Sequence, residues 1–300
     1  MKTVWGILIG AGMLALLVLI AGCSKDNSSN PASSGDTDQS ALTGIMSDDS
    51  DLEAVNAWDG DEDIGGSPLD SAVTPIRWQR RGVWHRTNID VQIQGDTLAT
   101  ITRTATFDGT LRVLIDTTGG TAVFVNKAMH NTLTRKAHAR RVGRTRLPRD
   151  NWRIYEVTPE VLVSTDSNTV HAARVQFFLG DTTNLTPLLD VSDPLNTYFS
   201  RDSLPLVPVG SQLTVVVTPS VTDPVSAYLH PHVWREGRFP RRPMEPLGDN
   251  TYRASFAVGE HLGVHETAPD LISHATLFTS DAPYDAGSWA IPYRVAAPSN

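Results

Sequence analysis

The stretch NIDVQIQGDTLATITRTATFDG, residues 88–109, decides the fold. Apolar and polar residues alternate along it, first over residues 89–94 and again over residues 99–107. Such alternation places every second side chain on the same face of an extended strand, which is the pattern of a half-buried β-strand. Gly95 and Asp96 separate the two segments and favour a tight turn, so we expect the two strands to pair antiparallel.

The period of two continues after this hairpin. Asp108-Gly109 is a strong signal for a second hairpin with a two-residue loop, and Gly119-Gly120 favour a third turn. The further strands expected are residues 111–115, 123–125, 133–142 and 152–157. We therefore expect residues 76–180 to form an antiparallel β-rich domain, with threonines on the exposed face of its sheet.

Upstream of this domain, residues 41–46 and 52–58 carry apolar side chains at helical spacing. One interpretation is a helix that packs on the domain, and the other is a disordered segment. A helix followed by a curved sheet that ends in Trp152 resembles the cystatin-like and nuclear-transport-factor-like folds. That resemblance implies that the domain is α+β.

The C-terminal residues 206–300 contain short stretches of strand-forming residues separated by Gly, Pro and Asp. The expected strands are residues 212–219, 225–234, 252–258, 272–278 and 289–295. Their spacing predicts a β-sandwich. Gly248–Tyr252 at the start of a strand and the closing aromatic strand resemble the immunoglobulin-like and fibronectin-type-III-like modules of secreted bacterial proteins, here without a disulfide.

Between the two expected domains, a strand pair over residues 161–179 is followed by the loop-rich residues 181–205. Domain boundaries fall in such exposed linkers. The fold class expected for the whole chain is therefore mainly β, an antiparallel sheet domain followed by an immunoglobulin-like β-sandwich, with residues 181–205 as the linker.

The N-terminal residues have the order of a secretory signal. Lys2 precedes an apolar run, and the run ends in the small residues Ala21 and Gly22 and in Cys23, the single cysteine of the chain. Ile20-Ala21-Gly22-Cys23 resembles the lipobox of bacterial lipoproteins. The resemblance implies that signal peptidase II cuts between Gly22 and Cys23, so that residues 1–22 are a signal peptide and Cys23 carries a covalent lipid. The alternative is a buried cysteine after an uncleaved helix.

The lipobox resemblance also implies a location. Two or more acyl chains anchor a protein stably, so the expected partner of Cys23 is a lipid bilayer. Ser24 follows the cysteine, where an Asp in lipoproteins of bacteria with two membranes favours inner-membrane retention. We therefore expect the outer membrane, with the protein facing the periplasm or the cell surface. Once Cys23 carries lipid, the mature chain has no thiol for a disulfide, a metal site or a nucleophile.

Charge is unevenly distributed along the chain. Residues 26–76 contain twelve Asp or Glu and no Lys or Arg, so we interpret residues 23–75 as the lipidated cysteine and an acidic, disordered tether. Residues 127–149, the basic stretch, contain eight Lys or Arg and no acid. The basic stretch is a docking surface for anionic partners, a surface covered by the acidic tether, or a solvated strand face that protects a sheet edge, and we favour the last. The net charge of −8 indicates no general affinity for nucleic acid.

Motifs of catalysis are missing from the sequence: there is no nucleophile elbow, P-loop, dinucleotide fingerprint or zincin motif. We therefore expect a non-catalytic protein with a binding or structural role, whose one prosthetic group is the lipid on Cys23. His230 and His232 form a His-x-His pair on an expected strand, with Tyr228 and Trp234 on the same outward face. They are candidate zinc ligands of a metal-dependent enzyme, although we favour a surface histidine pair.

The loop over residues 234–246 is the alternative binding site. Aromatic rings stack on sugars and arginines bind anions, so this loop is a candidate site for an anionic glycan, another polyanion or a protein partner. Its candidate residues are Trp234, Arg235, Arg238, Phe239, Arg241 and Arg242. The other interpretation is an ordinary sandwich loop stiffened by prolines, which we slightly prefer.

Overall fold

The computed structural model describes residues 37–49, 60–63, 74–116, 121–180, 183, 185–231 and 241–297. Contacts group Asp36–Asn300 into one compact unit. The expected signal peptide, the lipobox with Cys23 and much of the expected tether lie outside the described residues. Among the helices that are described, none is long and apolar enough to cross a membrane.

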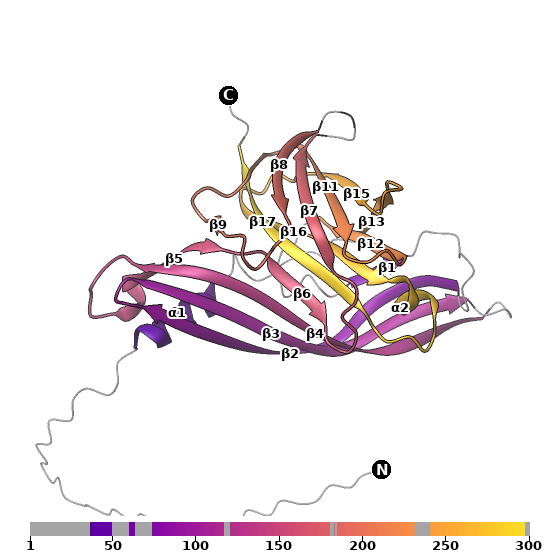
Figure 1. Cartoon of the computed structure of the whole chain (residues 1–300), viewed down its shortest axis with the longest axis horizontal. Helices are drawn as coiled ribbons and strands as arrows, with labels where there is room; N and C mark the ends of the chain where they lie inside the picture. Colours follow the sequence, from indigo (N-terminus) through magenta and orange to yellow (C-terminus); the bar gives the residue numbers. More distant parts are fainter. Residues whose placement is uncertain are drawn as a thin grey trace, which may run out of the picture. The chain divides into compact units, whose positions relative to one another are not determined.

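Three long antiparallel strands form the first part of the fold: β2 (Thr74–Gln94), β3 (Leu98–Asp116) and β4 (Ala122–Arg141). Figure 1 shows them side by side as one curved layer. The expected turn at Gly95 is confirmed, and this glycine adopts a φ of 60° that disfavours other residues. Ile101 and Ala137 are fully buried on the inner face of the layer.

The hairpin expected at Asp108-Gly109 is wrong, because β3 runs straight through it and Asp108 lies opposite His130. Phe107 and Leu111 are both buried, so the alternation keeps its phase across the dipeptide. A two-residue turn there would have put Leu111 on the opposite face from Phe107. Keeping both side chains in the core therefore favours the continuous strand.

The described strands form two sheets. The first has the order β1-β2-β3-β4-β6-β17-β16-β12-β13, with β5 beside β4, β9 beside β5 and β10 beside β17. The second has the order β14-β15-β11-β7-β8. Their bounds are β1 (Gly60–Asp63), β5 (Trp152–Val157), β6 (Glu160–Ser164), β7 (Ala172–Leu179), β8 (Thr186–Val191), β9 (Phe199–Ser200), β10 (Leu206–Pro208), β11 (Gln212–Pro219), β12 (Val225–His230), β13 (Arg242–Pro243), β14 (Glu245–Pro246), β15 (Tyr252–Ala257), β16 (Gly263–Ser273) and β17 (Ala286–Ala296).

The expectation of a mainly β protein with antiparallel sheets is confirmed. Phe177 and Val215 of the second sheet share one buried cluster with Leu229, Ile291 and other residues of β12, β16 and β17. The second sheet therefore packs face to face on the C-terminal strands of the first, in the manner of a β-sandwich.

The expected linker at residues 181–205 does not separate two sheets. Before it, β6 pairs with β17 and β7 pairs with β11, so strands from both sides of the linker share each sheet. The segment between β6 and β7 crosses from one sheet to the other and lies against Gly287 of β17. A Cβ at Gly287 would lie 2.5 Å from the carbonyl oxygen of Val170, so only glycine allows this approach.

Among the described residues, three helical segments accompany the sheets: α1 (Asp38–Asp48), α2 (His274–Phe278) and the 3-10 turn η3 (Pro148–Asn151). The strand expected over residues 272–278 is wrong, because β16 ends at Ser273 and α2 begins there. The Ser273 hydroxyl accepts the backbone N–H of Thr276 at 3.1 Å, which is an N-cap that favours a helix.

The helix interpretation holds for α1, and residues 50–59 lie outside the described part. Leu42 and Met46 are buried in one cluster with Ile101, Trp152 and Ile154 of the curved layer. A disordered tether over residues 23–75 is therefore wrong for α1 and for β1, which pairs with β2. Buried apolar side chains on α1 offset the cost of ordering an acidic segment.

Candidate functional site

His230 does not lie on an outward face. It is 6% exposed on β12, and its neighbour Leu229 is buried in the sandwich core. On the other face Tyr228 packs edge-to-face on Trp78 of β2, with ring centres 5.4 Å apart. The expected exposed face is wrong because the curved layer covers β12 on that side.

A zinc site is not assembled among the residues that the structure describes. No group of three or more His, Cys, Asp or Glu there is placed to hold a metal ion. His232 lies outside the described residues. His265 on β16 is bound through Nε2 to the backbone oxygen of His261 at 2.8 Å.

The 234–246 loop is described only from residue 241 onward, so Trp234, Arg235, Arg238 and Phe239 lie outside the described residues. Arg241 is 3% exposed, and its Nε lies 3.2 Å from the carboxylate of Asp270. Arg242 is exposed on β13. The structure therefore places these two arginines in different surroundings, one inside the fold and one on the surface.

A buried charge cluster joins the curved layer to the sandwich. Arg80 of β2 binds Asp270 of β16 through both terminal nitrogens, at 2.8 and 3.0 Å. Burial disfavours the charge of Arg80, but Asp270 and Tyr284 together outweigh it and raise the pKa of Arg80 above its ordinary value. Trp78 lies beneath two cations, since Arg80 and Arg241 are each 5.2 Å from the centre of its ring.

Two further buried pairs join strands that are not adjacent in the first sheet. Arg103 of β3 binds Glu160 of β6 at 3.1 Å, and Arg135 of β4 binds Glu266 of β16. Burial raises the pKa of Glu266 to about 7, an effect that Arg135 opposes and Glu160 reinforces. These charges hold the layers together because a buried charge is tolerated only beside its partner.

Sequence reasoning missed these pairs, although a signal was present. Arg103 occupies an inward position between Ile101 and Ala105, and Arg135 occupies one between Leu133 and Ala137. An arginine on the apolar face of a strand indicates a buried acidic partner. The identity of that partner lies far along the chain and is not visible in the spacing.

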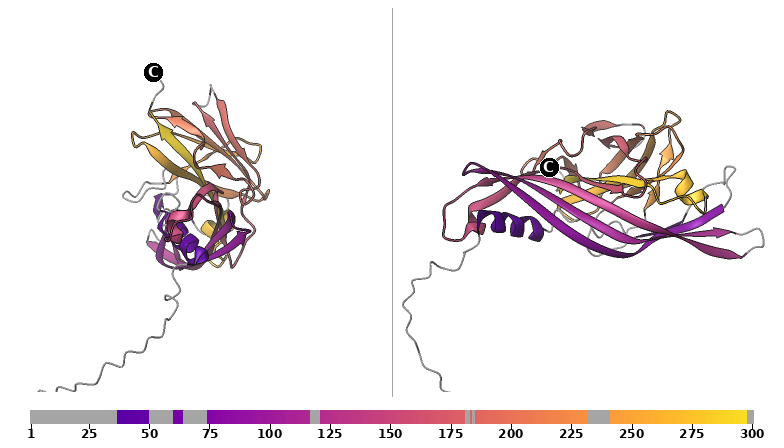
Figure 2. Two further views of the ribbon diagram at one scale, coloured as in Figure 1. Left: turned by 90° about the vertical axis from the view of Figure 1, so that its left-hand side faces the viewer. Right: turned by 60° about the horizontal axis from the view of Figure 1, so that its bottom comes forward.

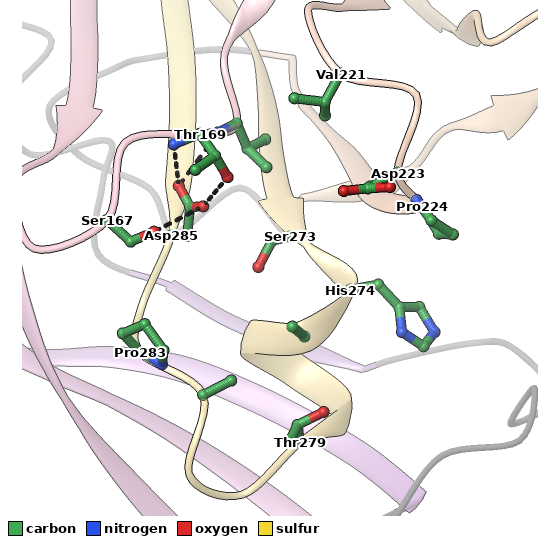
Figure 3. Close-up of a pocket in the computed structure, with 13 residues that line it drawn as sticks. Ser167, Thr169, Val221, Asp223, Pro224, Ser273, His274, Thr279, Pro283 and Asp285 are labelled. Carbon is green, nitrogen blue, oxygen red and sulfur yellow. Dashed lines mark hydrogen bonds between the residues drawn. The ribbon is translucent and has the colours of Figure 1, made fainter.

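A pocket of about 520 Å³ lies beside α2, lined by residues of the segments 167–170, 221–224 and 273–285. Asp285 stands at its inner side (Figure 3). One carboxylate oxygen accepts the backbone N–H groups of Thr169 and Val170, at 3.2 and 3.3 Å. The other accepts the hydroxyls of Ser167 and Thr169. Both oxygens of Asp285 are therefore occupied by the loop between β6 and β7.

Two other polar groups of this pocket, Ser273 and His274, are engaged or neutral. Ser273 caps α2 and hydrogen-bonds the Thr276 hydroxyl at 2.9 Å. His274 stacks on Phe278 with ring centres 3.8 Å apart, and burial lowers the pKa of His274, so its ring is neutral at pH 7. Asp223 and Asp285 are the charged side chains of the lining. The pocket therefore suits a small neutral or cationic polar molecule rather than an anion.

The basic stretch is divided between the interior and the surface. Lys127 donates to the carbonyl oxygens of Thr279 and Ala282, which border the pocket. Burial lowers the pKa of Lys127 to about 8. Arg135 is buried with Glu266 as described above. The interpretation of the basic stretch as one solvated strand face is therefore wrong for its inward members.

The acidic helix α1 covers another part of the basic stretch. Arg141 pairs with Asp38, and Arg149 pairs with Asp48 at 2.7 Å. Asp49, just after the helix, binds Arg201 at 2.5 and 3.3 Å. Arg201 lies outside the basic stretch, so the interpretation that acidic residues of the tether lie on the basic stretch is confirmed for Asp38 and Asp48.

Comparison of the chain with protein-family models, with curated proteins and with solved structures finds no match. The function is therefore argued from the residues and from their arrangement alone.

Proposed function

We propose that this protein is a membrane-anchored lipoprotein with a non-catalytic binding or structural role, held at the outer membrane and facing the periplasm or the cell surface. The lipobox-like residues 20–23 support the anchor. The C-terminal sandwich supports the role, because immunoglobulin-like modules, which it resembles in sequence, mostly position other domains or bind ligands.

The state of Asp285 is the observation that carries the non-catalytic part of this proposal. A general base must reach the proton of its substrate with an available acceptor atom. Both oxygens of Asp285 instead accept hydrogen bonds from the protein's own loop, and the Ser273 hydroxyl caps α2. The engagement of these two groups supports a pocket that binds a molecule rather than one that transfers its protons.

Mass spectrometry of the protein produced in a bacterium with two membranes tests the anchor. We expect an N-terminal peptide that begins at Cys23 and carries covalent lipid, and we expect the protein in the outer-membrane fraction. Cys23→Ala abolishes both, while Ser24→Ala, one position away, retains the lipid. An unmodified Cys23 peptide from the wild-type protein would overturn the proposal.

The alternative is a glycan or polyanion site in the 234–246 loop. Within it, Arg242 is exposed and Arg241 is committed to Asp270. This alternative predicts binding on a polysaccharide array that weakens with added salt and in the Trp234→Ala variant. Binding that changes with neither salt nor this substitution would contradict the alternative. A zinc enzyme built on His230 and His232 is the least favoured function, and metal analysis without stoichiometric zinc would remove it.

A further inference from the structure

The end of the curved layer that carries α1 has an unusual surface. Leu98, Val142 and Leu147 are 45%, 56% and 64% exposed there, and Leu147 is the most exposed of the large apolar side chains described. Leu98 lies directly opposite Arg140 in the sheet. The backbone N–H of Arg141 donates to Thr97 at 2.8 Å, so Val142 begins its loop beside the tip of the β2–β3 hairpin.

Cations surround these apolar residues. Arg140, Arg144 and Arg146 are exposed, and Arg144 and Arg146 make no ion pair within the described part of the chain. Arg141 and Arg149 are balanced by α1, as described above. Exposed acids at this end include Asp96, Asp150 and Asp48, of which Asp48 pairs with Arg149. Asp96 shares a shallow hollow of about 330 Å³ with Arg141 and Arg144. Apolar tips among surplus arginines are the pattern of a surface that meets anionic lipid.

The chain that leads to the expected anchor enters the fold at this same end. Asp38, the first residue of α1, is fixed by Arg141 and by the indole N–H of Trp152 at 2.9 Å. Figure 2 shows α1 and the loop after β4 at one end of the long strands. Cys23 lies 14 positions before Thr37, so the lipid is at most about 50 Å of extended chain away.

We propose that Leu98, Arg140, Val142, Arg144, Arg146 and Leu147, the docking end, bind the anionic headgroup surface of the bilayer that holds Cys23. The identity of that bilayer rests on the proposed lipid anchor, but the contact itself does not. Docking orients the sandwich away from the membrane and leaves the pocket beside α2 open to solution.

Vesicle binding by residues 24–300 tests the contact without the anchor, because this piece contains the whole compact unit Asp36–Asn300. The probes are vesicles of phosphatidylcholine with and without phosphatidylglycerol. An arginine near an anionic surface accounts for about fivefold in binding, so Arg144→Glu with Arg146→Glu should weaken binding at least about 25-fold. The control, Arg81→Glu with Arg86→Glu, changes the net charge equally at other exposed positions of β2 and should retain binding.

Each outcome decides the proposal. Binding that requires phosphatidylglycerol, falls with salt and is lost in the Arg144/Arg146 variant supports it, because the whole chain carries a net charge of −8 and only a local patch attracts the vesicle. Absence of wild-type binding overturns it, even where Cys23 is found lipidated. Loss in the Arg81/Arg86 variant alone also overturns it, because those arginines lie outside the docking end.

Insertion of the apolar tip has its own readout. Leu147→Trp should show a blue shift of its fluorescence on phosphatidylglycerol vesicles. Leu262→Trp places the same reporter at a side chain that is 63% exposed elsewhere in the fold, and it should show none. Equal behaviour of the two reporters overturns the docking geometry.

Discussion

The carboxylate of Asp270 on β16 receives both terminal nitrogens of Arg80 on β2, at 2.8 and 3.0 Å, and neither side chain is exposed to solvent. The two residues are 190 positions apart in the chain. Arg241 approaches the same carboxylate at 3.2 Å. One acidic group therefore faces two cations, one from an N-terminal strand and one from the segment before β13, at the place where the curved layer meets the sandwich.

Asp270→Asn should destabilise the fold by about 3–5 kcal/mol, because it leaves Arg80 and Arg241 buried without their counter-charge. Urea unfolding followed by circular dichroism measures this loss. The matched control is Asp190→Asn, which breaks a pair with Arg174 whose side chains are 50% and 46% exposed, and it should cost less than about 1 kcal/mol. Equal losses in the two variants would show that Asp270 does not stabilise the junction.

Gly287→Ala should also destabilise, for a steric reason. The new Cβ would lie 2.5 Å from the Val170 oxygen and 2.9 Å from the Cα of His171, both backbone atoms that cannot rotate away. Overpacking of this kind costs at least about 2 kcal/mol. Gly259→Ala is the control, since nothing lies within 4 Å of its Cβ position, and its thermal midpoint should stay close to that of the wild type. An unchanged midpoint for Gly287→Ala would contradict the close crossing at β17.

Local pattern predicted the parts of this fold that depend on neighbours in the chain. The β2–β3 turn at Gly95 and the bounds of β5 and β11 follow from alternation and turn residues. The pairing partner of each strand does not follow from local pattern, because β6 and β7 both have the alternation of half-buried strands. Nothing in their own residues shows that they belong to different sheets. The burial of His230 is likewise not predictable from local pattern. A polar residue at an alternate position indicates solvent, whereas here the curved layer covers it.

The response of stability to pH should depend on Glu266. Burial raises the pKa of Glu266 in the folded protein to about 7, against the opposing effect of Arg135, whereas an unfolded chain binds this proton near pH 4.3. The bound proton therefore stabilises the folded state at low pH, and this contribution to the free energy of unfolding is lost as the pH rises through 7. Relative to Glu266→Gln, the wild type should lose about 2 kcal/mol between pH 5 and pH 8. Urea midpoints of both proteins at the two pH values measure the difference, and parallel pH profiles would mean that Arg135 keeps Glu266 ionised throughout.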